Sequence, residues 1–508
     1  MDSAIDFLRN WLPLGRRDDG SEAAQALHEW LDGMQAAPPE EIAASLAQRL
    51  AAMVAVQGNL HMRVRLLDTF DDIAQELLPS LEREIETASL PFSSRTQLRA
   101  LAADNLLKAL AAGYGNVAAS IEMRKMAEGL APLVQHALQR AIASLRRRQL
   151  LAYRAYTTPS VASWQQLHET YRAATRLDLL GPTRTGPRIE HLYVSALLIA
   201  YAEPGKFART ELEALLDCAV RASGLVRLRH KEQFGELKAG APLFVVAPGE
   251  AGPGKPLVRM RDGGKAGYLY LDCTELAATI RSDIGAKTRL DMPHEWLLPN
   301  ASLSMLRTLS AMWGAQPTRR FSRMRFKPRA DLVIGLLDVT LFLGGGACRR
   351  RREDGSKRGP ALPSVSEWAL VDESPDGFGI RYVRGDIGSV EVGDVVALRP
   401  RESSQVQVCL VRRVSNAGQT RFEIGLQTLS AHALVVDLPG RSGGARAKGI
   451  LLPRMPALGN AAGLLALPGS VPEGLELHYP AGGSTVTLRL AQRIDGNPQV
   501  DFHALTPV

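Results

Sequence analysis

The residue pattern of the chain changes near Gly224, and this change restricts the folds that the chain can adopt. Before this point, Ala-, Leu- and Arg-rich segments place apolar residues three and four positions apart, as in helices with one buried face. After it, apolar runs are short, often alternate with polar residues, and are separated by glycine and proline turns, as strands are. The sequence therefore predicts a multidomain α+β protein, helical first and mostly β afterwards.

The length of the chain predicts several domains, because 508 residues exceed one ordinary hydrophobic core. The expected parts are an N-terminal lead at 1–22, a helical array at 23–224, a mixed β/α linker region at 225–313, a small antiparallel barrel at 314–432, and a further small β domain, itself barrel-like in pattern, at 433–508. From residue 326 onward we expect strands, including one in the apolar run at 331–343.

The helical array has features of a protein-interaction region. Trp164, Leu167 and Tyr171 have the spacing found in the first helix of a tetratricopeptide repeat, but the later landmarks of that repeat do not align. We therefore expect an irregular array of helix hairpins, a class that usually presents a surface to another protein. Within the array, the run at 146–148 consists of three arginines, which we interpret as a solvated helix face.

Composition limits the remaining possibilities. No apolar run is long enough to span a bilayer, and the first residues lack a cationic leader and a cleavage-site pattern, so we expect a cytoplasmic protein, with peripheral attachment to a membrane complex or a cell pole still compatible. The four cysteines are scattered and form no C-x-x-C, so we expect reduced thiols and no zinc site. A net charge of +8 allows an anionic partner without naming one.

An arginine motif lies directly before the predicted barrel. Arg319 and Arg323 form an R-x-x-x-R pattern, and Arg320 lies beside them as a third donor. The planar guanidinium of arginine can bind guanine O6 and N7 together, can hold a phosphate with two hydrogen bonds, or can stack on a base. The motif therefore suits a guanine-bearing anion.

A turn motif follows some fifty residues later. Asp372, Ser374 and Gly377 form a D-x-S-x-x-G pattern between two predicted strands. The carboxylate can accept hydrogen bonds from guanine N1 and N2, and the serine hydroxyl can reach a phosphate or a base edge. The glycine permits a positive φ and a close approach of backbone.

The two motifs, in this order, resemble the signature of PilZ domains, the bacterial receptors for cyclic di-GMP. Residues 392–395 and 422–426 also resemble later strands of the PilZ barrel, and the resemblance covers about residues 317–430. It implies that the barrel expected at 314–432 is a six-stranded antiparallel β-barrel. It implies that Arg319, Arg320 and Arg323 bind guanine and phosphate. It implies equally that Asp372, Ser374 and Gly377 form the opposite wall of the cyclic di-GMP site.

The resemblance also implies that the protein is not an enzyme. PilZ domains bind cyclic di-GMP, often as a stacked dimer of the nucleotide, and the arginine lead commonly reorders on binding. No catalytic residue, metal or cofactor is therefore expected beyond the nucleotide ligand. The leading hypothesis is an effector that senses cyclic di-GMP through the barrel and relays the signal through the helical array to a partner protein. Surface motility or type IV pilus control is the output suggested by analogy.

Two features depart from the PilZ pattern and keep alternatives open. Glu373 and Asp376 place negative charge beside the proposed phosphate site. The connection between the motifs contains four consecutive arginines, Arg349, Arg350, Arg351 and Arg352. One alternative is a degenerate PilZ scaffold that binds protein only. Another is a nucleic-acid-binding protein that uses this four-arginine cluster, although no stacking aromatics are interleaved with it.

Overall fold

The computed structural model of the chain contains two compact units. It describes residues 21–508 except for 55–58, 123–128, 184–185, 231–232, 234–239, 248, 261–266, 290–298, 300, 315–327, 346–363, 402, 417–420, 440–446, 455–460, 473, 482–483 and 498. The helical unit comprises Met1–Ala88, Phe92–Pro204 and Arg209–Pro317, and the barrel unit comprises Ser89–Pro91, Gly205–Ala208 and Thr318–Val508. The domain boundaries expected from sequence stay predictions.

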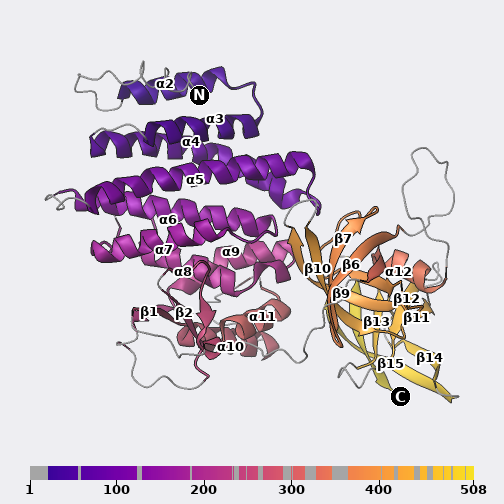
Figure 1. Cartoon of the computed structure of the whole chain (residues 1–508). Coiled ribbons are helices and arrows are strands. Elements are labelled where there is room, and N and C mark those ends of the chain that lie inside the picture. Colours follow the sequence, from indigo (N-terminus) through magenta and orange to yellow (C-terminus); the bar gives the residue numbers. More distant parts are fainter. Residues whose placement is uncertain are drawn as a thin grey trace. The chain divides into compact units, whose positions relative to one another are not determined.

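The helical unit is a stack of antiparallel helices that follow one another in chain order (Figure 1). The helices are α2 (Ser21–Gly33), α3 (Pro39–Val54), α4 (Leu60–Thr87), α5 (Ser94–Glu122), α6 (Ala131–Arg154), α7 (Val161–Arg176), α8 (Ile189–Tyr201) and α9 (Arg209–Ser223), with the 3₁₀ turn η1 (Pro204–Lys206) between the last two. Their starts have the expected capping chemistry: Ser93 Oγ accepts from Thr96 N at the start of α5, and Ser160 Oγ accepts from Ser163 N at the start of α7. The prediction of a helical first part is confirmed.

The three arginines of α6 do not form the solvated face that the sequence suggested. Arg147 Nε lies 2.7 Å from Glu82 Oε1 on α4, and Arg148 Nε lies 2.5 Å from Asp104 Oδ1 on α5. Arg146 donates from Nε to Ser195 Oγ on α8 at 2.7 Å. Successive helical residues point about 100° apart, and α6 has neighbours on several sides, so each arginine meets a different helix.

A small mixed region closes the helical unit. It contains the strands β1 (Arg227–His230), β2 (Leu243–Val246), β3 (Lys255–Pro256) and β4 (Leu269–Asp272), in the order β1-β4-β2-β3, with the 3₁₀ turn η3 (Leu257–Arg259) and the helices α10 (Thr274–Arg289) and α11 (Leu303–Trp313). Buried His168 of α7 ties the loop after β2 to the helices, because its Nε2 lies 2.8 Å from Gly252 O. Among helices in the described ranges, none is long and apolar enough to cross a membrane.

The barrel unit begins with a closed six-stranded antiparallel barrel, as the sequence predicted. The strands are β5 (Arg329–Ile334), β6 (Ser366–Ser374), β7 (Gly377–Arg384), β8 (Val395–Pro400), β9 (Gln407–Asn416) and β10 (Phe422–Ser430), in the closed order β10-β7-β6-β5-β8-β9. Trp368, Ile380 and Ile424 are buried, while their neighbours along each strand are more exposed. This alternation separates an inner apolar face from an outer polar face.

One predicted strand is a helix. The run at 331–343 gives only the end of β5, after which Gly335 turns the chain with a φ of 92° into α12 (Leu336–Leu343). An apolar run this short has no decisive period, so its secondary structure depends on what it packs against. Here α12 buries Val339 and Phe342 among residues of the barrel and of the C-terminal sheet.

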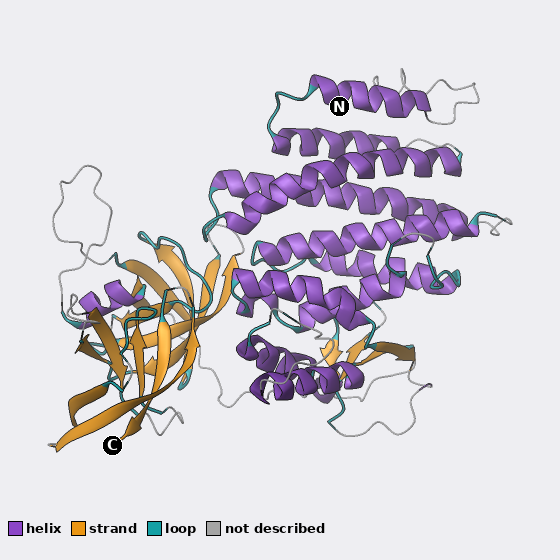
Figure 2. Cartoon of the chain, turned by 180° about the vertical axis from the view of Figure 1, so that it is seen from behind, coloured by secondary structure: helices purple, strands orange, loops and turns teal. Residues whose placement is uncertain are grey.

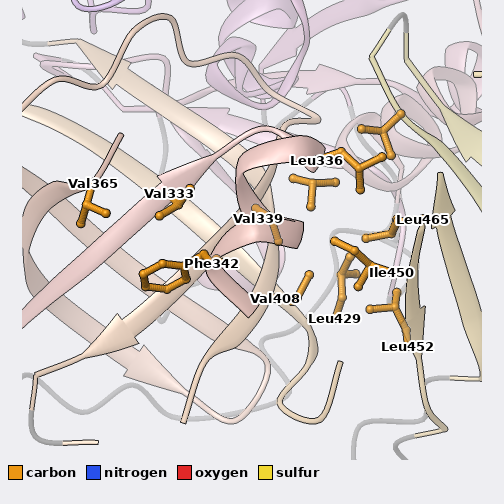
Figure 3. Packing of buried hydrophobic residues seen from close by; sticks show 13 residues of the cluster. Val333, Leu336, Val339, Phe342, Val365, Val408, Leu429, Ile450, Leu452 and Leu465 are labelled. Carbon is orange, nitrogen blue, oxygen red and sulfur yellow. The ribbon is translucent and has the colours of Figure 1, made fainter. Parts of the chain in front are cut away.

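The C-terminal segment forms an open antiparallel sheet that shares a core with the barrel. Its strands are β11 (Leu434–Leu438), β12 (Ala447–Leu452), β13 (Gly463–Ala466), β14 (Glu476–Ala481), β15 (Ser484–Gly496) and β16 (Asp501–Pro507), in the order β11-β12-β13-β16-β15-β14. Ile450, Leu452 and Leu465 of this sheet pack with Val339 of α12 and Val408 of β9 (Figure 3). The barrel strands and these strands accordingly appear as one group, with α12 beside them, in Figure 2.

Candidate functional site

The turn motif lies in the tight hairpin between β6 and β7. Ser374 pairs with Gly377 across a two-residue turn. The Ser374 hydroxyl, which is 8% exposed, donates to Asp376 Oδ1 at 2.6 Å and lies 3.2 Å from Gly377 O. Asp376 O in turn accepts from Thr428 N of β10 at 3.0 Å. The serine hydroxyl therefore holds the turn in shape, and Asp376 is its acceptor.

Gly377 is required by a close backbone approach and not by its own conformation. A Cβ at this position would lie 1.9 Å from Leu426 O of β10, far inside van der Waals contact. Its φ is not among the positive values found in the described residues. The motif suggested either a positive φ or a close approach of backbone as the reason for glycine here, and the structure supports the close approach.

Asp372 lies on the outer face of the barrel, next to the hairpin. A bulge between Leu370 and Asp372 shifts the register of β6, and Asp372 then pairs with Gly379 of β7. A Cβ on Gly379 would lie 2.6 Å from Asp372 Oδ1, so the carboxylate lies above this glycine. The bulge and the glycine together direct the carboxylate across the outer surface of β7.

The chain that follows the arginine motif enters the barrel beside Asp372. Arg319, Arg320 and Arg323 lie outside the described residues, which resume at Pro328. Pro328 O accepts from Leu370 N at 3.0 Å. The segment that carries the arginines therefore joins the barrel two positions from Asp372.

Cross-strand register extends the site to residues that the motifs did not include. Asp372 of β6, Gly379 of β7, Gly425 of β10 and Arg413 of β9 are successive cross-strand partners, and we call them the glycine row. The sequence contained one sign of it: Gly425 occupies an outward position between buried Ile424 and Leu426. The pairing of Gly379 with Gly425 joins residues 46 positions apart, so spacing along the chain does not reveal it.

Neither the four-arginine cluster nor a metal site can be added to this site from the described residues. The four-arginine cluster lies outside the described residues, so its predicted role stays a prediction. Across the part of the chain that the structure describes, no group of three or more His, Cys, Asp or Glu side chains could hold a metal ion.

Comparison with known proteins relates the helical region to a receptor family. Residues 25–232 match the family model described as cyclic-di-GMP receptor FimW, N-terminal domain. The chain is similar to a cyclic-di-GMP receptor. The relative is the cyclic-di-GMP receptor FimW of Pseudomonas aeruginosa, which is 24% identical over 330 residues, covering 62% of this chain and 52% of the relative.

These similarities cover only part of the chain and part of the relative. The chain spans about half the length of the curated relative it matches. The family model covers helices α2 to α9 and not the barrel, so the PilZ resemblance of the barrel still depends on its motifs and on its six-stranded topology. No solved structure matches the chain.

Proposed function

We propose that this protein is a receptor for cyclic di-GMP, which binds on the outer face of the barrel beside the β6–β7 hairpin. The observation that carries the proposal is the position of Pro328, which pairs with Leu370 and so joins the arginine segment to the barrel next to Asp372. The similarity of residues 25–232 to a cyclic-di-GMP receptor family supports the same ligand from a different part of the chain.

Each motif residue has a proposed role. Arg323 and Arg319 bind guanine and phosphate, with Arg320 as a further donor. A chain of five residues spans at most about 17 Å, so Arg323 can reach the surface around Asp372 from Pro328. The Asp372 carboxylate accepts from guanine N1 and N2.

Ser374 and Gly377 act on the hairpin in this proposal. Their contacts with Asp376 and with the Leu426 carbonyl hold the turn that positions Asp372. A rigid frame of this kind improves binding because less order has to be gained when the ligand arrives.

The signal leaves through the helical region in the same proposal. Reordering of the arginine segment on binding changes the chain that connects α11 to β5, and the helical array presents the surface for a protein partner. The protein acts as a receptor and not as an enzyme. Surface motility or type IV pilus control is the first output to test.

Titration calorimetry of the full chain with cyclic di-GMP at tens of micromolar tests the proposal. We expect saturable binding, and a loss of about 10- to 100-fold in affinity in Asp372→Ala and in Arg323→Ala, because each removes a charged hydrogen-bonding group. Glu373→Ala, which removes the neighbouring carboxylate, is the matched control for Asp372→Ala and should bind at least as well as the unchanged protein.

Two results would contradict the proposal. The first is an absence of heat with cyclic di-GMP, which would favour the protein-only scaffold. The second is steeply salt-dependent binding of DNA or RNA that is lost when the four-arginine cluster becomes alanine, which would favour the nucleic-acid alternative.

A further inference from the structure

We infer that the ligand surface continues from Asp372 along the glycine row to Arg413, a residue outside both motifs. A guanine whose N1–N2 edge meets the Asp372 carboxylate above Gly379 lies flat on Gly425, and the Arg413 guanidinium at the end of the row binds the phosphate. The inference rests on the proposed function, since it names the placement of the same nucleotide.

The first support is the geometry of the row. Gly379 pairs with Asp372 on one side and with Gly425 on the other, and Gly425 pairs with Arg413. Neighbouring strands are about 4.8 Å apart, so the row extends roughly 14 Å from Asp372 to Arg413. The residues on either side of the glycines along β7 and β10, including Phe378, Ile380 and Ile424, are buried, so the row itself faces outward.

The second support is the absence of side chains at the centre of the row. Glycine in a strand interior costs roughly 0.5–1 kcal/mol relative to alanine and often marks a close approach of ligand or backbone. Neither Gly379 nor Gly425 has a positive φ, so backbone conformation does not require glycine at either position. At Gly379 the Asp372 carboxylate occupies the space of a side chain, whereas at Gly425 a Cβ would meet only Arg413 Cβ, at 3.3 Å. A flat ring can lie directly on the bare backbone at Gly425.

The third support is Arg413 itself. A bulge in β9, where Gly425 pairs with Arg413 and Leu426 pairs with Val411, places Arg412 and Arg413 both on the exposed face. Arg412 donates from Nε to Gln427 Oε1 at 2.7 Å. Among the described residues, the Arg413 guanidinium has no hydrogen-bond or ion-pair partner, so it is available to an anion.

The walls of the row are polar and already paired. Along β7 and β10, Arg381 lies 2.6 Å from Glu423 Oε1 and borders the glycines on one side. The Arg412–Gln427 hydrogen bond borders them on the other side. The Asp372 carboxylate and the Arg413 guanidinium face the row from its two ends, and their charges suit the two ends of a guanine nucleotide.

Calorimetry of the full chain with cyclic di-GMP, at two salt concentrations, tests this inference. In Arg413→Ala we expect about 10-fold weaker binding, an unchanged melting temperature and a shallower dependence of affinity on salt, because a charged contact with phosphate is lost. In Gly425→Val, whose side chain would occupy the proposed position of the base, we expect at least 10-fold weaker binding. Arg421→Ala removes an exposed arginine beyond the row and should leave affinity unchanged.

The outcomes separate this inference from the proposed function. If the unchanged protein binds and Asp372→Ala does not, while Arg413→Ala or Gly425→Val binds normally, the inference is wrong and the proposed function stands. If the unchanged protein does not bind cyclic di-GMP, both are wrong. If Gly425→Val melts at a lower temperature, Arg413→Ala decides, since it changes only an exposed side chain.

Discussion

Gly377 shows how one residue of a binding motif can act mainly through folding. The Leu426 carbonyl of β10 lies where its Cβ would be, and Ser374 holds the same turn through Asp376. The hairpin thus depends on a glycine and a serine whose contacts are internal. Among the three residues of the turn motif, Asp372 is the one whose carboxylate lies over the outer surface.

Gly377→Ala should destabilise the barrel unit by roughly 1–3 kcal/mol, because β7 and β10 must move apart to admit the methyl group. Gly115→Ala is the matched control, since a Cβ there meets nothing within 4 Å and alanine favours the α5 helix. Hydrogen exchange of β6, β7 and β10 in the full chain measures the difference. Unchanged protection of these strands in Gly377→Ala would contradict the argument.

Helix α6 is the element whose chemistry differs most from its sequence pattern. Its arginines cross to α4, α5 and α8, and Arg154 at its end lies 3.5 Å from Glu82 and 2.8 Å from Glu213. Ion pairs between half-buried groups stabilise one register of the helices. In another register each acid would lose its arginine and remain poorly solvated. Positive charge within the array therefore stabilises packing.

Arg147→Met should lower the free energy of unfolding of the helical unit by roughly 1–3 kcal/mol, because the one ion pair left to Glu82 among the described residues is the longer contact to Arg154. The control is Arg95→Met, since the Arg95 side chain is 71% exposed and lies 3.9 Å from Glu40. That change should cost no more than about 0.5 kcal/mol. Urea denaturation followed by circular dichroism makes the comparison, and equal losses in the two variants would contradict it.

At the scale of the whole molecule, each unit contains a buried titratable group, and the two have opposite effects on stability. In the helical unit, burial lowers the pKa of His168, which lies 2.8 Å from both Tyr193 Oη and Gly252 O. In the barrel unit, burial raises the pKa of Asp394 to about 6, although its Oδ2 accepts from Glu391 N at 2.8 Å. These two groups should therefore contribute to the acid response of their units in opposite directions.

When the pH falls from 7 to 5, His168 should contribute a destabilisation of the helical unit, and Asp394 should contribute a stabilisation of the barrel unit. Below about 6.5 the unfolded chain protonates His168 more readily than the folded one does, so folding loses free energy. Between about 4 and 6 the folded barrel holds a proton on Asp394 that the unfolded chain has lost, so folding gains free energy as pH falls.

Hydrogen exchange of the full chain at several pH values resolves the two units. His168→Gln should flatten the pH dependence of the helical unit alone, and Asp394→Asn that of the barrel unit alone. A parallel change in both units, or no effect of either variant, would show that other groups control the pH dependence.

The local pattern of the sequence by itself determined the change from helices to strands, the short antiparallel strands of a small barrel and the hairpin that holds Asp372, while the count of six strands came from the PilZ resemblance. Helix periods, capping serines and tight-turn residues are set by neighbours a few positions apart, so they can be inferred without a fold. The same local chemistry identified Asp372, Ser374 and Gly377 as candidate site residues.

Tertiary structure decided the features that depend on distant partners. The run at 336–343 became helix α12 because it packs between barrel and C-terminal sheet, and the arginines of α6 became paired because acids on other helices face them. The glycine row exists only through strand register, which brings Arg413 and Gly425 beside Gly379. The local sequence pattern does not show contacts between residues that are far apart in the chain. Because such contacts set the strand register, they determine how far the candidate site extends.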